Sequence, residues 1–139
     1  MLTIRATALI FGVFLSCAAM AETFDGSVPL QCTVSQAHDC LPGAGGGCKP
    51  MQPESTKPLV VSIDVPKKAI RTPFRTSILP ILHHTTNAEA LVLQGADLLF
   101  AWGALINKKS GALTIAVTDR KGAYVIFGQC KAADAKGAM

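Results

Sequence analysis

The chain lacks several features that mark common classes of protein. It has one tryptophan, one tyrosine and a formal net charge of only +4 over 139 residues. Its lysines and arginines are scattered over turns and the tail, and they form no basic stripe with interleaved aromatic residues. Nucleic-acid binding therefore has no electrostatic footprint in this sequence.

Catalytic signatures are also missing. No serine stands in a Gly-x-Ser-x-Gly elbow, and Asp64, Glu89, Asp97 and Asp119 fall singly at expected strand ends or turns. A catalytic triad assembled from distant positions is the alternative. Because no motif with a stated mechanism is present, we expect no enzymatic activity and no cofactor.

The cysteines lack the spacing of a metal or redox motif. Seven residues separate Cys32 from Cys40 and Cys40 from Cys48, and no Cys-x-x-Cys pair occurs. With Cys130 they make an even set, which in an exported chain is first interpreted as two disulfides. A metal site and a redox pair are the alternatives.

Four cysteines allow three connectivities, and spacing alone does not select one. We expect Cys40–Cys48, which would close the glycine-rich "LPGAGGG" loop, and Cys32–Cys130, which would tie the first strand to the last. A cross-link in a flexible loop removes conformational entropy from the unfolded chain. The two disulfides would therefore staple a small domain.

The first apolar run is too short for a membrane span, which takes about 20 residues. It covers Ala6 to Leu15, follows Arg5, and precedes the small residues of Ala19-Met20-Ala21. This order is typical of a secretory signal peptide, here residues 1–21. We expect cleavage after Ala21 and a periplasmic or secreted product without a transmembrane segment. A membrane anchor and a lipoprotein cut at Cys17 are the alternatives.

The remaining chain has the length of one domain. Removing 21 of the 139 residues leaves 118, and removing one cation leaves a net charge of +3. We expect a first strand and a Cys/Gly/Pro-rich loop over 22–58. A β meander of the same domain follows over 59–130, and a flexible tail over 131–139.

Alternating apolar and polar residues predict strands in the first half of the meander. "LVVSIDV" at 59–65 alternates with a period of two, and "KKAIRT" at 67–72 is its expected partner. Pro73 and Pro80 break any helix in the next segment. The pattern there is ambiguous, and a short strand over 77–82 is one interpretation.

Four later apolar runs predict an antiparallel meander: "EALVLQG", "DLLFAWGALIN", "GALTIAVT" and "AYVIFGQC". The separators "QGAD" (94–97), "NKKSG" (107–111) and "DRKG" (119–122) hold turn-forming residues. Gly103, in the middle of a run, predicts a bend or a close backbone approach. No long amphipathic helix is visible. The predicted fold class is all-β, a small disulfide-stapled antiparallel meander closed or nearly closed into a barrel or sandwich.

Aromatic residues of the meander are the candidate ligand-binding groups: Trp102, Phe100, Tyr124 and Phe127. If Trp102 faces a groove, these rings would hold a small apolar ligand or a protein partner; otherwise they form core.

Three histidines are the candidate metal ligands: His83, His84 and His38. Adjacent strand residues point to opposite faces, so His83 and His84 could share a metal only from an irregular loop. Solvated loop histidines are the simpler interpretation.

Two cationic pairs form a further candidate surface. The pairs Lys108-Lys109 and Arg120-Lys121 are expected at one end of the meander, where they would form a positive rim for anionic partners. Ordinary soluble turns are the alternative.

The chain resembles a family of small exported proteobacterial proteins. The likeness rests on "FDGSVPLQC", on the "LQG" segment followed by Trp102 and Gly111, and on the closing "FGQC". It implies a shared fold and export, and no chemistry. The glycine-rich loop before Cys48 departs from the family pattern. A second likeness, to periplasmic lysozyme inhibitors of the small-barrel type, is architectural and carries no function.

The favoured hypothesis is a non-enzymatic periplasmic binding or interaction protein. Its partner would be an unknown protein or a small apolar ligand held near Trp102. A metal-handling protein using the histidines is one alternative. An inhibitor of a secreted hydrolase is another, with the Cys40–Cys48 loop inserted into the enzyme's cleft, because a rigid loop loses less entropy on binding.

Overall fold

The computed structural model describes residues 24–51, 58–74 and 76–134. Within these ranges every regular element is a strand, which confirms the all-β prediction. The strands are β1 (Leu30–Leu41), β2 (Gly47–Pro50), β3 (Val60–Asp64), β4 (Ala69–Arg71), β5 (Leu79–Pro80), β6 (His83–Thr86), β7 (Ala90–Asp97), β8 (Phe100–Asn107), β9 (Ala112–Asp119) and β10 (Ala123–Ala132). No helix capable of crossing a membrane occurs in this part of the chain.

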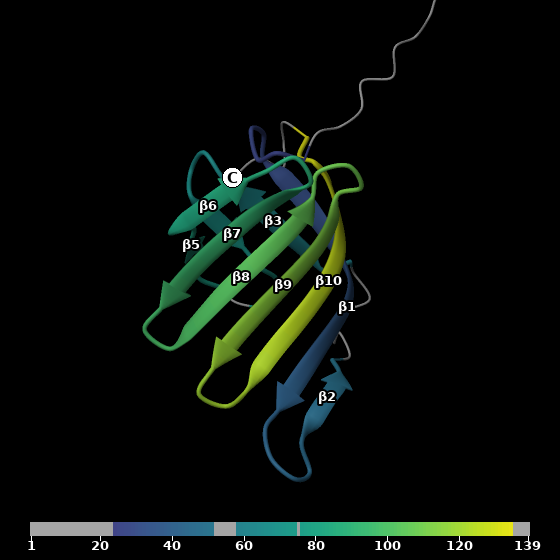
Figure 1. The fold of residues 1–139 in the computed structure, drawn as a ribbon, viewed down its shortest axis with the longest axis vertical. Helices are drawn as coiled ribbons and strands as arrows, with labels where there is room; N and C mark the ends of the chain where they lie inside the picture. The colour runs from purple at the N-terminus through teal and green to yellow at the C-terminus, as the bar shows by residue number, and fades with distance from the viewer. Residues whose placement is uncertain (1–23, 52–57, 75, 135–139) are drawn as a thin grey trace, which may run out of the picture.

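The strands form one antiparallel sheet in the order β5-β4-β3-β1-β10-β9-β8-β7-β6, and β2 pairs with β1 outside this path. The sheet curls into a half-barrel, so that β3 and β5 lie behind β7 and β8 (Figure 1). The segment between β5 and β6 links the two edge strands of the sheet, which are β5 and β6 themselves. Ile81 N donates to Lys68 O and Leu82 N donates to Gln94 O, both at 2.9 Å.

The concave face of the sheet holds the core. Leu113 and Ile115 on β9 point inward, while Thr114 and Ala116, which alternate with them along the strand, are exposed, as period-two alternation requires. The most deeply buried apolar side chains of the strands gather on this face: Leu30, Cys32, Val61, Ile63, Ile70, Leu91, Leu93, Ile106 and Leu113.

Both expected disulfides are present, Cys32–Cys130 and Cys40–Cys48. Each joins directly opposed residues of paired strands: Cys32 and Cys130 link β1 to β10, and Cys40 and Cys48 link β1 to β2. The Cys32–Cys130 bond thus ties the first strand to the last.

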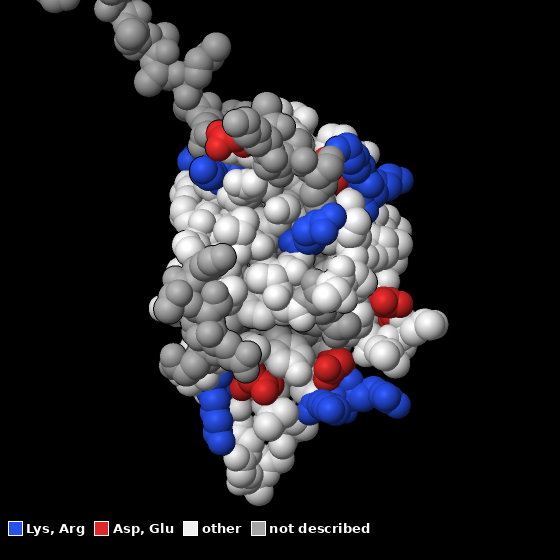
Figure 2. Space-filling model, turned by 180° about the vertical axis from the view of Figure 1, so that it is seen from behind, with Lys and Arg blue, Asp and Glu red and all other residues white. Residues whose placement is uncertain are grey.

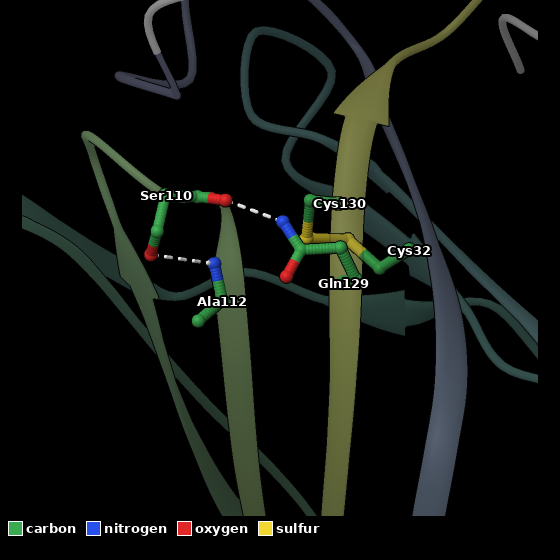
Figure 3. The surroundings of a disulfide bond; sticks show 5 residues. All are labelled: Cys32, Ser110, Ala112, Gln129 and Cys130. Carbon is green, nitrogen blue, oxygen red and sulfur yellow. Dashed lines mark hydrogen bonds between the residues drawn. A yellow bond between two sulfur atoms is a disulfide. The ribbon is translucent and has the colours of Figure 1, made fainter.

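Hydrogen bonds hold the β8–β9 turn beside the Cys32–Cys130 disulfide (Figure 3). The Gln129 side-chain amide donates to the Ser110 carbonyl, and the Cys130 amide donates to the Gly111 carbonyl at 2.9 Å. The Ser110 hydroxyl accepts from the Ala112 amide at 3.3 Å. The disulfide and the turn therefore form one connected unit at this end of the sheet.

The turn predicted at "QGAD" is wrong. Residues 94–97 belong to β7, and the chain reverses at the next two residues, Leu98 and Leu99. Gly95 serves packing instead, because a β-carbon there would lie 2.5 Å from the Trp102 ring. The close approach predicted at Gly103 is also wrong, since the nearest atom to its virtual β-carbon is 3.9 Å away.

The single positive rim predicted for the two cationic turns is wrong as well. Lys108-Lys109 follow β8 and Arg120-Lys121 follow β9, so they sit on consecutive turns of the meander. Consecutive turns of an antiparallel meander lie at opposite ends of the sheet. Figure 2 accordingly shows Lys and Arg side chains toward both ends of the molecule.

Two predicted boundaries shift. β10 continues to Ala132, past the expected start of the tail at 131, and the Ala133 amide donates to the Pro29 carbonyl at 2.8 Å. The loop after the first strand contains β2, which pairs with β1. The predicted signal peptide, residues 1–21, lies outside the described residues.

Candidate binding cavity

A cavity of about 450 Å³ opens into the half-barrel between its two walls. One wall consists of β8, β9 and β10, and the other of β4, β5 and the segment after β4. The lining residues are Met51, Ile70, Thr72, Phe74, Leu79, Phe100, Trp102, Ile115, Val117, Tyr124 and Ile126.

The sheet wall of the cavity follows from strand periodicity and register. Its lining residues on β8, β9 and β10 are two apart along each strand and therefore share the concave face. Trp102 opposes Val117, and Val117 opposes Tyr124, so these three side chains form a row across the strands. Ile115 and Ile126 form a second row beside it.

The cavity occupies one end of the half-barrel interior. Phe100 begins β8, and Tyr124 is the second residue of β10, so both lie next to the β7–β8 and β9–β10 turns. The opposite end is filled by buried side chains such as Ile106 and Leu113, which oppose each other beside the β8–β9 turn. The empty volume is thus confined to the end farther from the Cys32–Cys130 disulfide.

The chemistry of the lining is apolar and uncharged. Among the described residues that line it there is no lysine, arginine, aspartate, glutamate or histidine, and the side-chain hydroxyls belong to Thr72 and Tyr124. The Trp102 Nε1 atom is buried and has no hydrogen-bond partner among the described residues, so its N–H is an unsatisfied donor in an otherwise largely apolar lining. A lining of this kind suits a small, uncharged, largely apolar molecule.

The mouth of the cavity is marked by its less buried residues. Phe74 is exposed, and Met51 and Thr72 are half-buried, whereas Trp102, Ile115 and Ile126 are buried at the base. Met51 is held by its amide, which donates to the Ala37 carbonyl at 2.8 Å.

Three of the four predicted ligand-binding aromatics line the cavity: Trp102, Phe100 and Tyr124. Phe127 does not, and that prediction is wrong. It lies on the other face of β10, 37% exposed, with its ring centroid 6.3 Å from that of His38. The reason is the strand period of two, which places the side chain of Phe127 on the face of β10 away from Tyr124 and Ile126.

Several lining residues carry no sequence signal. Met51, Thr72 and Phe74 come from segments between strands, where no periodic pattern marks an inward side. The curl of the sheet brings these segments toward β8, β9 and β10. The apolar residues within 70–74 are the only sequence feature that could have indicated the segment after β4, and no feature indicates Met51.

The structure does not gather the predicted metal ligands. His83 and His84 are exposed residues of β6, where neighbours point to opposite faces, and not the loop residues that were expected. His38 lies on β1, and β10, β9, β8 and β7 separate β1 from β6 in the sheet. No cluster of three or more His, Cys, Asp or Glu residues suited to a metal occurs in the described ranges. The four cysteines in the described residues are joined in the two disulfides, so they present no thiolate ligands.

Comparison with known proteins identifies no relative: no family model, no curated protein and no solved structure matches the chain. The resemblance to the exported proteobacterial family therefore stays a prediction.

Proposed function

We propose that the chain is a non-enzymatic binding protein that holds a small, uncharged, largely apolar molecule in the cavity beside Trp102. The cavity itself carries the proposal. Its volume of about 450 Å³ lies within the usual range for small-molecule sites, roughly 300–1,000 Å³. Its base is buried and apolar, so a ligand would gain free energy by removing apolar surface from water.

The composition of the lining supports binding over catalysis. General acid–base chemistry needs a positioned titratable group, most often His, Asp, Glu or Lys. No residue of these types lines the cavity in the described ranges 24–51, 58–74 and 76–134. The hydroxyls of Thr72 and Tyr124 are suited to orienting a polar atom of a ligand.

The two disulfides support an extracytoplasmic site of action, because disulfides persist in oxidising compartments. We propose that residues 1–21 are removed as a signal peptide and that the mature chain works in the periplasm. It would then share its fold with the exported proteobacterial family that its sequence resembles.

The test is a titration with N-phenyl-1-naphthylamine, a neutral probe whose fluorescence rises in apolar surroundings. We expect saturable binding to the oxidised mature chain, accompanied by a change in the emission of Trp102, the only tryptophan. Val117→Phe should weaken binding at least roughly ten-fold, because the larger ring fills space in the lining.

Phe127→Ala is the matched control, since Phe127 lies on the outer face. It should bind the probe as the wild type does. Circular dichroism and thermal unfolding of each variant establish that the fold is retained. Absence of saturable binding, or equal binding by folded Val117→Phe, would contradict the proposal.

A second candidate function, inhibition of a secreted hydrolase, is favoured by the β1–β2 hairpin. Residues 41–50 are all exposed, and the hairpin projects at the lower end of the sheet in Figure 1. The Cys40–Cys48 bond and the hydrogen bond from Gly46 N to Gly43 O restrict its loop. Such a restricted, protruding loop is suited to entering a cleft.

The inhibition hypothesis is tested by assaying secreted glycosidases and proteases with the mature chain. Inhibition should disappear when residues 42–46 are shortened while the disulfide is kept. Inhibition that survives this change, or its absence across the panel, would leave the cavity as the site of function.

A further inference from the structure

The β7–β8 turn exposes two adjacent leucines. Leu98 is 97% exposed and Leu99 is 60% exposed, although two-residue hairpin turns favour Asn, Asp and Gly. At the same end of the sheet, Leu41, the last residue of β1 before the β1–β2 turn, is also exposed. Apolar side chains gathered at one end of a molecule mark a surface that another molecule covers.

Cations lie on the neighbouring turn. β8 pairs with β9, with Phe100 opposite Asp119, so the β7–β8 and β9–β10 turns are adjacent. Figure 1 shows them side by side at the lower end of the sheet. Arg120 and Lys121 on the second turn are both exposed. Apolar tips and positive charge are therefore presented in one direction.

The carboxylates of these two turns are directed back onto their own backbones. Asp97 Oδ1 accepts from the Leu98 amide at 2.7 Å. Asp119 Oδ1 accepts from the amides of Lys121 at 2.7 Å and Gly122 at 3.0 Å. Both acids are therefore engaged by the backbone of their own turn, while Arg120 and Lys121 are exposed beside them.

We propose that this end of the half-barrel docks on an anionic lipid surface. Leu98 and Leu99 would enter the interfacial region, and Arg120 and Lys121 would contact headgroup phosphates. A projecting leucine needs a shaped pocket in a protein partner, whereas lipid closes around it. A second copy of the chain would bring the same cations against each other, which disfavours self-association.

The inference goes beyond the proposed function and does not depend on it, because it stands on the turns alone. The two are spatially connected, however. Phe100 follows Leu99 directly and lines the cavity. Docking would thus place the cavity next to the membrane surface, where small apolar molecules accumulate.

The test is binding of the oxidised mature chain to vesicles, measured by flotation. One set contains phosphatidylethanolamine and phosphatidylglycerol, and the other contains phosphatidylcholine alone. We expect preferential binding to the anionic vesicles that weakens as salt rises. Replacing both leucines (Leu98→Ser with Leu99→Ser) should weaken binding about ten-fold or more. Replacing both cations (Arg120→Gln with Lys121→Gln) should weaken it about five-fold per charge.

Matched controls come from elsewhere on the sheet. Leu105→Ser changes an exposed leucine on the outer face of β8, and Lys108→Gln with Lys109→Gln removes two cations at the opposite end. Both should bind vesicles as the wild type does. The inference is overturned if the wild type binds neither vesicle type, or if the turn variants bind no more weakly than the controls. A further outcome is a dimer, detected by sedimentation, that is lost in the variant with both leucines replaced. That result would mean that the β7–β8 turn contacts a second copy of the chain, and it would also overturn the inference. Probe binding in the cavity reports on the proposed function separately.

Discussion

The ring of Trp102 lies directly against Gly95 on the neighbouring strand. A β-carbon at position 95 would be 2.5 Å from both Cε2 and Cζ2 of the indole, and 2.4 Å from the carbonyl oxygen of Pro80. Gly95 and Trp102 are opposed in the β7–β8 ladder. The missing side chain therefore lets both the indole and the Pro80 carbonyl lie close to β7.

Gly95→Ala should destabilise the protein by about 2–4 kcal/mol, because the added methyl group meets a ring and a backbone carbonyl that have little freedom to move. The measurement is the free energy of unfolding in urea. Gly103→Ala, one register position away on β8, is the matched control. Its added carbon meets nothing closer than 3.9 Å, so the change should stay within about 0.5 kcal/mol. Equal effects at the two positions would refute this account of Gly95.

These two glycines show a limit of prediction from sequence. Both positions carry a glycine beside apolar residues, and the local pattern predicts a turn at Gly95 and a close approach at Gly103. In the structure the close approach is at Gly95 and neither glycine lies in a turn, because close approach is set by which side chain lies opposite in the ladder. That information is absent from either segment alone.

The strands and both disulfides could be predicted from the sequence. Alternation within single runs identifies the meander, and an even cysteine count in an exported chain indicates disulfides. The cavity was only partly predictable. Trp102 and Tyr124 sit on periodic strands, but Thr72 and Phe74 reach the cavity through the curl of the sheet, which depends on contacts far apart in sequence.

Loss of the Cys32–Cys130 disulfide should destabilise the fold more than loss of Cys40–Cys48. The first joins residues 98 apart in sequence and the second residues 8 apart. Loop-closure entropy then gives about 4.7 kcal/mol for the first and about 2.5 kcal/mol for the second. Paired Cys→Ala variants compared by urea unfolding test this order. A larger loss from the Cys40/Cys48 pair would mean that strain or packing, and not chain entropy, dominates.

Gly111→Ala should also destabilise, for a reason different from Gly95. Gly111 has a φ of +72°, and a β-carbon there would lie 2.8 Å from Cζ of Phe24 and 2.9 Å from the Cys130 carbonyl oxygen. Both backbone strain and a clash oppose the side chain. We expect a loss of about 2–3 kcal/mol in unfolding free energy. Gly43→Ala has a φ of +100° but open space around it, and so isolates the strain component; a loss at Gly43 as large as that at Gly111 would rule out the clash.

The Asp25–Ser27 turn should make a small contribution to stability that depends on pH. The Ser27 hydroxyl donates to Asp25 Oδ1 at 2.6 Å and the Ser27 amide donates to the same atom at 2.9 Å, which together hold the pKa of Asp25 below its usual 3.8. Because the pKa is lower in the folded than in the unfolded chain, the stabilisation is present above pH 3.8 and is lost as pH falls through the folded pKa.

Ser27→Ala removes the hydroxyl, the larger of the two causes, and leaves the backbone donor in place. The pKa of Asp25 should therefore rise part of the way toward 3.8, and the acid dependence of stability should become shallower. The measurement is an NMR titration of the Asp25 side-chain carboxyl carbon in both proteins. An unchanged pKa in Ser27→Ala would show that the Ser27 hydroxyl does not cause the shift. A wild-type pKa at or above 3.8 would show that the turn does not persist in solution.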